Sequence, residues 1–344
     1  MKLLYFTDLH ARGTNPRART DDYTAAMFRK LAEVRSLAEI HQVKAVLFGG
    51  DLFHAPDAAD SVKGELIRFL RTFPVPIVGV WGNTHDIWGD NPLTLGRTAR
   101  GVVEAAGAMQ LLKPGEPYLI EADGLKVQIT GQGYHEEMDR RDWRLDYCVY
   151  PEGDPSAPEG HQHWRSPEVT WAIHIAHGML RTEPLMVGVP VTLVEDVLRE
   201  TKADITLSGH DHNGYGVIEA HHRRACNPGA LMRLTADRKE IDRPIQAALI
   251  TLADTCKVEL LPITCATVGA EVLDRTHIER AEARGNSMDR FMESVKSGGD
   301  FEAIDVAGVV ERIAANKGVA AEVKAEAISR VHAAQEELVT EDAA

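Results

Sequence analysis

The sequence predicts an α/β fold in which strands and helices alternate along the chain. Short apolar runs typical of buried strands alternate with longer segments whose apolar residues recur at helical spacing. The first three apolar runs each stop at a side chain that can bind a metal ion: Asp8, Asp51 and Asn83. Open α/β sheets present functional groups at the carboxyl ends of their strands in this way, so both observations predict the same fold class.

The first part of the chain contains three predicted strands separated by two predicted helices. In the first helix the apolar residues from Met27 to Ile40 recur every three or four positions, which is typical of an amphipathic helix. The predicted strands are 2–7, 45–48 and 77–81, and the predicted helices are 25–41 and 61–71.

The second part of the chain has the composition of further strands. Two of them precede histidine motifs, and the last four are short and closely spaced, so we expect these four to form an antiparallel edge to a second sheet. The predicted strands are 126–130, 171–176, 204–207, 215–219, 224–226, 247–252 and 257–261.

Residues 132–168 are rich in Pro, Gly and charged side chains and have no clear period, which predicts a long loop. Long loops inside compact domains are more often functional than not, so this one either shapes the substrate site or is an idle excursion. We expect its His161 and His163 to be solvated. His174, on the following strand, is expected to be a hydrogen-bonded core residue.

The composition changes at about Cys265 to Ala, Glu and Arg with helical periods. We therefore predict a catalytic domain over 1–264 and a small helical C-terminal module over 265–344, which serves as an accessory or partner-docking region. Within it, 319–338 carries a narrow apolar stripe. Either a partner covers this stripe or it packs on the main domain.

Composition and charge exclude several classes of protein. No apolar run approaches the roughly 18 residues of a membrane-spanning helix, and no signal sequence is visible, so we expect a cytoplasmic protein without a membrane partner. The four cysteines lack CxxC spacing, which argues against a zinc ribbon. The net charge of −14 argues against a general nucleic-acid binder. It does not exclude a nuclease, because bound cations oppose the charge locally.

The polar residues at the predicted strand ends form a set of potential metal ligands with two carboxylates, one amide and four imidazoles. They are Asp8, His10, Asp51, Asn83, His177, His210 and His212. This mixture of oxygen and nitrogen suits Mn²⁺, Fe²⁺ or Zn²⁺ better than Ca²⁺ or Mg²⁺. Seven ligands are too many for one tetrahedral ion. Two ions about 3.5–4 Å apart account for them, and such pairs catalyse phosphoryl displacement.

In order along the chain, these residues form the motifs D-x-H, G-D, G-N, H and G-H-x-H, and this pattern resembles the calcineurin-like metallophosphoesterase superfamily. The resemblance covers 1–264 and implies a four-layer α/β/β/α sandwich of two mixed sheets flanked by helices. It implies that one metal is held by Asp8, His10 and His212. The other is held by Asn83, His177 and His210, and Asp51 bridges the two. A metal-bridging hydroxide would be the nucleophile.

Three further stretches are similar to the SbcD-type nuclease family of double-strand-break repair: 50–54, 227–233 and 259–263. This resemblance implies a Mn²⁺-dependent DNA exo/endonuclease of repair or recombination in which His54 and His85 position the substrate and protonate the leaving oxygen. It implies DNA and a coiled-coil ABC-type ATPase of SbcC type as partners, and it leaves a homodimer open. The alternative is a metallophosphatase or phosphodiesterase that acts on a small molecule or a phosphoprotein.

One departure from the family pattern concerns the proposed acid. The family has Gly-Asn-His, whereas this chain has Thr84 inserted between Asn83 and His85. In an extended loop the added residue would move His85 by about 3.3 Å, beyond reach of the scissile phosphate. A bulge at Thr84 would restore its position. We expect His85 to be the general acid, with His54 or the metals alone as the alternatives.

Two groups of arginines follow metal motifs and are expected near the mouth of the site. They are Arg12, Arg17 and Arg19 after the first motif and Arg97 and Arg100 after the third. Either they contact substrate phosphates or they belong to solvated loops.

Overall fold

The computed structural model describes residues 1–276, 314 and 321–330 of the chain. The chain divides into two compact units, Met1–Arg275 and Thr276–Ala344. Most of the expected helical module lies outside the described residues. The structure describes its residues 265–276, which include α7 (Gly269–Val272), residue 314 and the helical segment 321–330. The assignment of catalysis to 1–264 and of partner docking to 265–344 stays a prediction. No helix in the described segments is both long enough and apolar enough to cross a membrane.

The first sheet has six strands in the order β16-β15-β1-β2-β3-β4. The strands from β1 to β4 are parallel, whereas β15 and β16 are antiparallel to their neighbours. Its members are β1 (Lys2–Phe6), β2 (Val46–Phe48), β3 (Ile77–Gly79), β4 (Gln110–Leu111), β15 (Gln246–Leu252) and β16 (Cys256–Pro262). The helices α1 (Tyr23–Ile40), α2 (Asp60–Leu70) and α3 (Ala99–Ala105) connect or precede the parallel strands.

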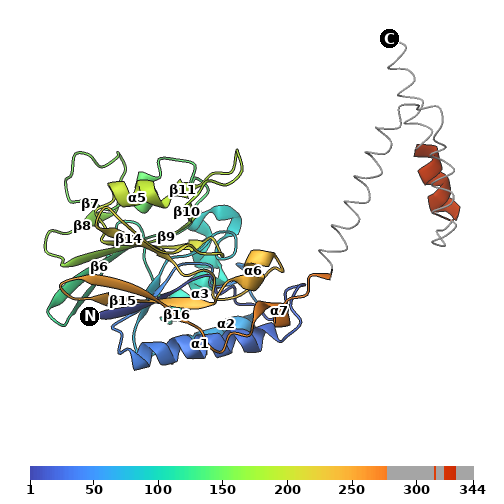
Figure 1. Cartoon of the computed structure of the whole chain (residues 1–344), viewed down its shortest axis with the longest axis horizontal. Coiled ribbons are helices and arrows are strands. Elements are labelled where there is room, and N and C mark those ends of the chain that lie inside the picture. The colour runs from blue at the N-terminus through green and yellow to red at the C-terminus, as the bar shows by residue number, and fades with distance from the viewer. Residues whose placement is uncertain (277–313, 315–320, 331–344) are drawn as a thin grey trace, which may run out of the picture. The chain divides into compact units, whose positions relative to one another are not determined.

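The second sheet also has six strands, in the order β13-β14-β12-β9-β6-β5. Its centre is parallel and both of its edge pairs are antiparallel. Its members are β5 (Tyr118–Ala122), β6 (Leu125–Gln132), β9 (Trp171–Gly178), β12 (Ile205–His210), β13 (Gly216–Ala220) and β14 (Arg223–Asn227). The short helix α5 (Val194–Glu200) lies on its outer face (Figure 1).

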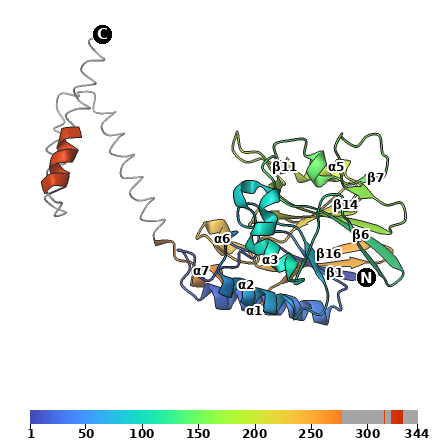
Figure 2. The ribbon, with the colours of Figure 1, turned by 180° about the vertical axis from the view of Figure 1, so that it is seen from behind.

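The side chains of β1 show how the sequence builds the layers. Leu3 and Tyr5 are buried between the two sheets, whereas Leu4 and Phe6 pack outward with α1 and α2. This alternation follows from the two-residue period of a strand. Figures 1 and 2 show α1 and α2 along the outer side of the first sheet and α5 on the opposite side of this unit. The expected α/β/β/α sandwich of two mixed sheets is therefore confirmed.

One expectation about the strand order is wrong. Of the four strands expected at this edge, β13 and β14 lie there, whereas β15 and β16 belong to the first sheet, in which β15 pairs with β1. The physical reason is burial on both faces. Ala248 and Ile250 of β15 lie between the sheets, while Ala247 and Leu249 pack in the outer core. A strand apolar on both faces fits an interior position better than an exposed edge.

The segment 132–168 contains more structure than expected: α4 (Arg144–Tyr147), β7 (Tyr150–Pro151) and β8 (Trp164–Arg165). The expectation of solvated histidines there is wrong, because His161 and His163 are only 7% and 1% exposed. The Nε2 of His163 lies 3.1 Å from Oε1 of Gln132 in β6, so packing on the sheet removes it from solvent. His174 is a hydrogen-bonded core residue, as expected.

The remaining short elements surround the ends of the sheets. They are β10 (Leu180–Arg181), β11 (Thr192–Leu193), α6 (Arg238–Asp242), α7 (Gly269–Val272) and the 3₁₀ turns Trp88–Asp90 and Pro92–Arg97.

Candidate metal centre

The predicted ligands meet where strands of both sheets end. Asp8, Asp51 and Asn83 lie in the loops that follow β1, β2 and β3, which are parallel neighbours. From the second sheet, His177 lies near the end of β9 and His210 is the last residue of β12. Because β9 and β12 are also parallel and paired in register, their histidines reach the same edge.

The first cluster consists of Asp8, His10, Asp51 and His212, whose ligand atoms all lie within 4.8 Å of one another. Nε2 of His10 lies 3.0 Å from Nε2 of His212 and 3.6 Å from Oδ2 of Asp51. Nε2 of His212 lies 3.8 Å from Oδ1 of Asp8. Ligand atoms that are far apart in the sequence thus converge on one point.

The second cluster consists of Asp51, His177 and His210, again with ligand atoms within 4.8 Å. Nε2 of His177 lies 3.5 Å from Oδ1 of Asp51. The amide of Asn83 joins this cluster, because its Nδ2 lies 3.4 Å from Nδ1 of His210. Asp51 is shared by both clusters, so the arrangement is that of two adjacent ion sites with one common carboxylate.

The candidate ligand atoms are suited to binding a metal ion, because some of them are buried and make no hydrogen bond. Among the described residues, Oδ2 of Asp51 and Nε2 of His177 are buried and have no hydrogen-bond partner. Such atoms cost free energy unless they meet a ligand or an ion. Nδ1 of His177 lies 2.7 Å from the carbonyl oxygen of Gly49 and donates to it. This leaves the Nε2 lone pair free for a metal.

The electrostatics of the two clusters keep Asp51 and His210 in forms that bind cations, whereas His177 has to release a proton before it can bind one. Burial alone would raise the pKa of Asp51, but His177 and His10 hold it well below its usual range. Burial and the charge of His177 lower the pKa of His210 to about 3. Burial also favours neutral His177, yet the Asp51 carboxylate raises its pKa to about 9. At neutral pH a cation therefore meets an ionised Asp51 and a neutral His210.

The two predicted catalytic histidines lie next to the first cluster. The ligand atoms of His10, His54 and His85 lie within 4.8 Å of one another. The ring of His85 is 4.6 Å from that of His10 and stacks on that of His54 at 5.1 Å, measured between centroids. Nδ1 of His85 lies 2.7 Å from the carbonyl oxygen of His54 and donates to it. Their role in proton transfer stays a prediction.

The inserted residue Thr84 is absorbed by a turn. The backbone N–H groups of Asp86 and Ile87 both donate to the carbonyl of Asn83, at 2.9 and 3.0 Å. The segment is therefore compact rather than extended, and the displacement expected for an extended loop does not occur. His85 remains beside His10 despite the longer motif.

Asp86 is a positioning residue whose role the sequence did not predict. Its buried carboxylate accepts hydrogen bonds from the backbone N–H groups of Leu52, Phe53 and Gly82, at 3.2, 3.1 and 2.8 Å. These residues belong to the loops that carry Asp51 and Asn83. Asp86 thus ties two ligand loops together. The one signal in the sequence was its place after His85 in the third motif.

Tyr134 is a second residue that the sequence did not single out. Its ring centroid lies 5.4 Å from that of His210 and 6.3 Å from that of His177. It belongs to the start of the 132–168 segment, which therefore contributes an aromatic wall to the second cluster.

Not all of the arginines expected at the mouth of the site are accessible to a substrate. Arg19 is buried and pairs with Asp21 at 2.7 Å. Arg100 is fully buried because it lies on the inward face of α3, so neither side chain is available to a substrate. Arg12 remains partly exposed. Its positive charge lies close enough to His54 to lower the pKa of that histidine. Burial and Arg12 together lower the pKa of His54 to about 4.

Comparisons with solved structures gave distant similarities. A dimetal phosphatase from Danio rerio is 14% identical, with 76% of this chain and 96% of that chain covered and a TM-score of 0.46. An archaeal phosphodiesterase is 12% identical, with 76% and 100% covered and a TM-score of 0.36. A protein from Thermus thermophilus is 14% identical, with 76% and 98% covered and a TM-score of 0.42. The curated proteins gave no match.

The comparison with protein families gave a match over more than half of the chain. The family described as calcineurin-like phosphoesterase matches residues 1–214, a range that contains all seven predicted ligands from Asp8 to His212. Nothing in the comparisons points to the SbcD-type nucleases in particular. The chain belongs to the calcineurin-like phosphoesterase family and is a metal-dependent phosphoesterase.

Proposed function

We propose that this phosphoesterase is a two-metal phosphodiesterase that cleaves DNA, as the SbcD-type nucleases do. The observation that carries the proposal is the pair His54 and His85 beside the first ligand cluster. Cleavage of a phosphodiester in DNA releases an alkoxide, which needs a proton. A histidine next to the ion site is well placed to supply that proton.

The ligands divide between two ions as the geometry suggests. Asp8, His10 and His212 would hold one ion, and Asn83, His177 and His210 the other, with Asp51 between them. Two divalent ions, Mn²⁺ by resemblance with Fe²⁺ or Zn²⁺ as alternatives, supply an activated water molecule and neutralise charge on the phosphoryl group.

His85 is oriented for proton donation by its backbone partner. Its Nδ1–H donates to the carbonyl of His54, which fixes the ring and leaves Nε2 as the free nitrogen. In the imidazolium form both nitrogens carry a proton, so Nε2–H can protonate a leaving oxygen while Nδ1–H stays bound. Both His54 and His85 are partly exposed, as a group that meets a substrate must be.

The preference for DNA over a smaller substrate rests on the resemblance of 50–54, 227–233 and 259–263 to the SbcD-type nucleases. A coiled-coil ABC-type ATPase that binds the C-terminal helical module belongs to the same proposal. Action in the cytoplasm is an expectation from the sequence, and a homodimer is left open.

The test uses purified full-length protein stripped of metal with a chelator. We would incubate it with end-labelled duplex and single-stranded DNA, with and without Mn²⁺, and beside the generic diester bis(p-nitrophenyl) phosphate. Stepwise Mn²⁺-dependent shortening of the DNA, absent in an Asp51→Ala variant, supports the nuclease. Hydrolysis of the reporter with intact DNA would overturn it and favour a phosphoesterase of small molecules or phosphoproteins.

A further inference from the structure

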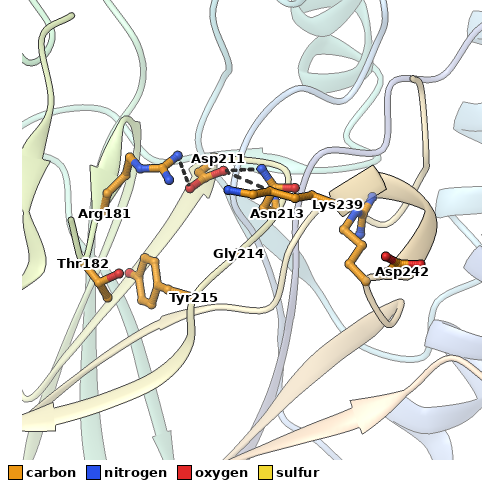
Figure 3. A pocket seen from close by; sticks show the side chains of 9 residues that line it. Arg181, Thr182, Asp211, Asn213, Gly214, Tyr215, Lys239 and Asp242 are labelled. Carbon is orange, nitrogen blue, oxygen red and sulfur yellow. Dashed lines mark hydrogen bonds and ion pairs between the residues drawn. The ribbon is translucent and has the colours of Figure 1, made fainter. Parts of the chain in front are cut away.

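A cavity of about 380 Å³ opens beside the metal centre, and the mechanism above does not use it (Figure 3). Two of its walls come from residues that lie close to predicted ligands in the sequence. Asp211 lies between His210 and His212, and Arg181 lies four residues after His177. The third wall is α6, which contributes Lys239. The cavity therefore adjoins the segments that carry His177, His210 and His212.

Three basic and two acidic side chains line the cavity, and one of the basic ones is largely occupied. The guanidinium of Arg243 donates to the carbonyl oxygens of Ala230 and Met232, at 2.6 and 2.9 Å, and bonds to Glu240. Arg243 thus holds the loop after β14 in place. Four of its five N–H donors are engaged in these bonds.

The other two basic side chains keep unused donors. The Nη1 of Arg181 pairs with Asp211 at 2.8 Å, and no hydrogen bond or ion pair in the described parts of the chain engages its Nη2. Lys239 is exposed, and no hydrogen bond or ion pair with another described residue engages its ammonium group. Figure 3 shows both side chains on the same cavity, with Asp211 and Asn213 between them. This arrangement offers N–H donors to an anion from two sides.

The chain is acidic overall, with a net charge of −14, so a cavity with an excess of basic groups is unusual for this surface. Its volume falls within the range of roughly 300–1,000 Å³ of small-ligand sites, which is larger than one phosphate group requires. An anion that carries more than one phosphate group fits these two features.

We propose that this cavity binds the nucleotide next to the scissile phosphodiester, with Lys239 and the Nη2 of Arg181 contacting its phosphate. This inference rests on the proposed phosphodiesterase function and specifies it. The preferred substrate carries at least two phosphates, which distinguishes an oligonucleotide from a simple phosphate ester. Lys239 and Arg181 are positioning residues here, because they touch the neighbouring phosphate and not the reacting one.

The test compares esters that share one leaving group. Thymidine monophosphate p-nitrophenyl ester has one phosphate, and the thymidine dinucleotide esterified at either end has two. We expect the Mn²⁺-loaded protein to prefer a two-phosphate ester in kcat/KM. Lys239→Ala should lower that preference about tenfold, mainly through KM, as for the loss of one charge-assisted hydrogen bond. Lys239→Arg should restore it.

Lys257→Ala is the matched control, since Lys257 is an exposed lysine on β16 that pairs with Glu259. It should keep the preference of the parent protein. Equal kcat/KM for all esters in the parent protein, or an unchanged preference in Lys239→Ala, would overturn the inference.

A binding experiment separates this inference from the function on which it rests. If no ester is hydrolysed, the proposed phosphodiesterase function fails, but calorimetric titration of the full chain with thymidine dinucleotide 5′-phosphate still tests the cavity. We expect tighter binding than for thymidine alone, with the difference reduced in Lys239→Ala. Equal affinities would remove the cavity as a nucleotide site.

Discussion

Asp51 is the residue on which both proposed ion sites depend, because its carboxylate belongs to both ligand clusters. We predict that Asp51→Ala loses metal binding at both sites together with all Mn²⁺-dependent hydrolysis. Metal content by mass spectrometry and hydrolysis of bis(p-nitrophenyl) phosphate would be measured on the same sample. A variant that kept two ions per chain would contradict the shared role of this carboxylate.

His85 differs from Asp51 in that the proposed function places it beside the metal ligands and not among them. We predict that His85→Ala keeps its metal content and loses activity on DNA by roughly 10²–10⁴-fold, the usual contribution of a general acid. The loss should be much smaller with a p-nitrophenyl ester, whose leaving group needs no proton. Full activity on DNA in His85→Ala would leave protonation to His54 or to the metals.

Asp86 should matter for stability as well as for the site. In Asp86→Ala three buried N–H groups, those of Leu52, Phe53 and Gly82, lose their acceptor. We predict that the free energy of unfolding falls by about 3 kcal/mol or more, at roughly 1–3 kcal/mol for each buried unpaired group. Urea unfolding of the metal-free protein would measure it. Asp254→Ala, at an exposed aspartate, should change it by less than about 0.5 kcal/mol.

At the scale of the elements, the loops after the strands are built so tightly that small residues are required. A Cβ atom on Gly82 would lie 1.8 Å from Oδ1 of Asp51 and 2.5 Å from its backbone nitrogen. The loop after β3 therefore approaches the loop after β2 closely enough to leave room only for glycine.

We predict that Gly82→Ala displaces the Asp51 carboxylate and weakens metal binding at both sites. The secondary structure should survive, because the change is confined to two loops. Metal titration by calorimetry, with circular dichroism as the check on folding, would show this. Gly96→Ala is the control, because a Cβ atom there meets nothing within 4 Å. Normal metal affinity in Gly82→Ala would mean that the two loops separate without cost.

At the scale of the whole molecule, the buried histidines make stability depend on pH. His174 is fully buried between the sheet and α4, where its Nε2 donates to the carbonyl of Asp146 and its Nδ1 pairs with Thr130. Burial lowers its pKa from the usual 6.5 to about 4. Between these two values the unfolded chain binds a proton that the folded protein does not bind.

Stability should therefore fall as the pH drops from 6.5 to 4, by at most about 3 kcal/mol from His174 at 1.4 kcal/mol per pKa unit. We predict that His174→Gln, which cannot take up a proton, shows a weaker loss of stability over this range. Urea unfolding of both metal-free proteins at pH 7, 6, 5 and 4 would measure the difference. Parallel curves would show that His174 is not the titrating group.

Although β4, β5, α3 and α5 were missed, the sequence by itself predicted ten of the twelve strands of the two sheets, the helices α1 and α2 and the candidate ligands. These features depend on local patterns: a two-residue or helical period of apolar residues, and a polar residue directly after an apolar run. Parallel strands bring their ends to one edge, so Asp8, Asp51 and Asn83 had to lie close together once the sheet was predicted. The resemblance then supplied how the ligands divide between two ions.

Only the tertiary structure decided which side chains meet across long separations. The place of β15 beside β1, the burial of His161 and Arg100 and the cavity between Arg181 and Lys239 all depend on how layers pack. Local periodicity carries no information about such contacts, because burial is decided by the neighbour that covers a residue and not by the residue's place along the chain. The motifs thus predicted the candidate metal site, whereas packing decided what surrounds it.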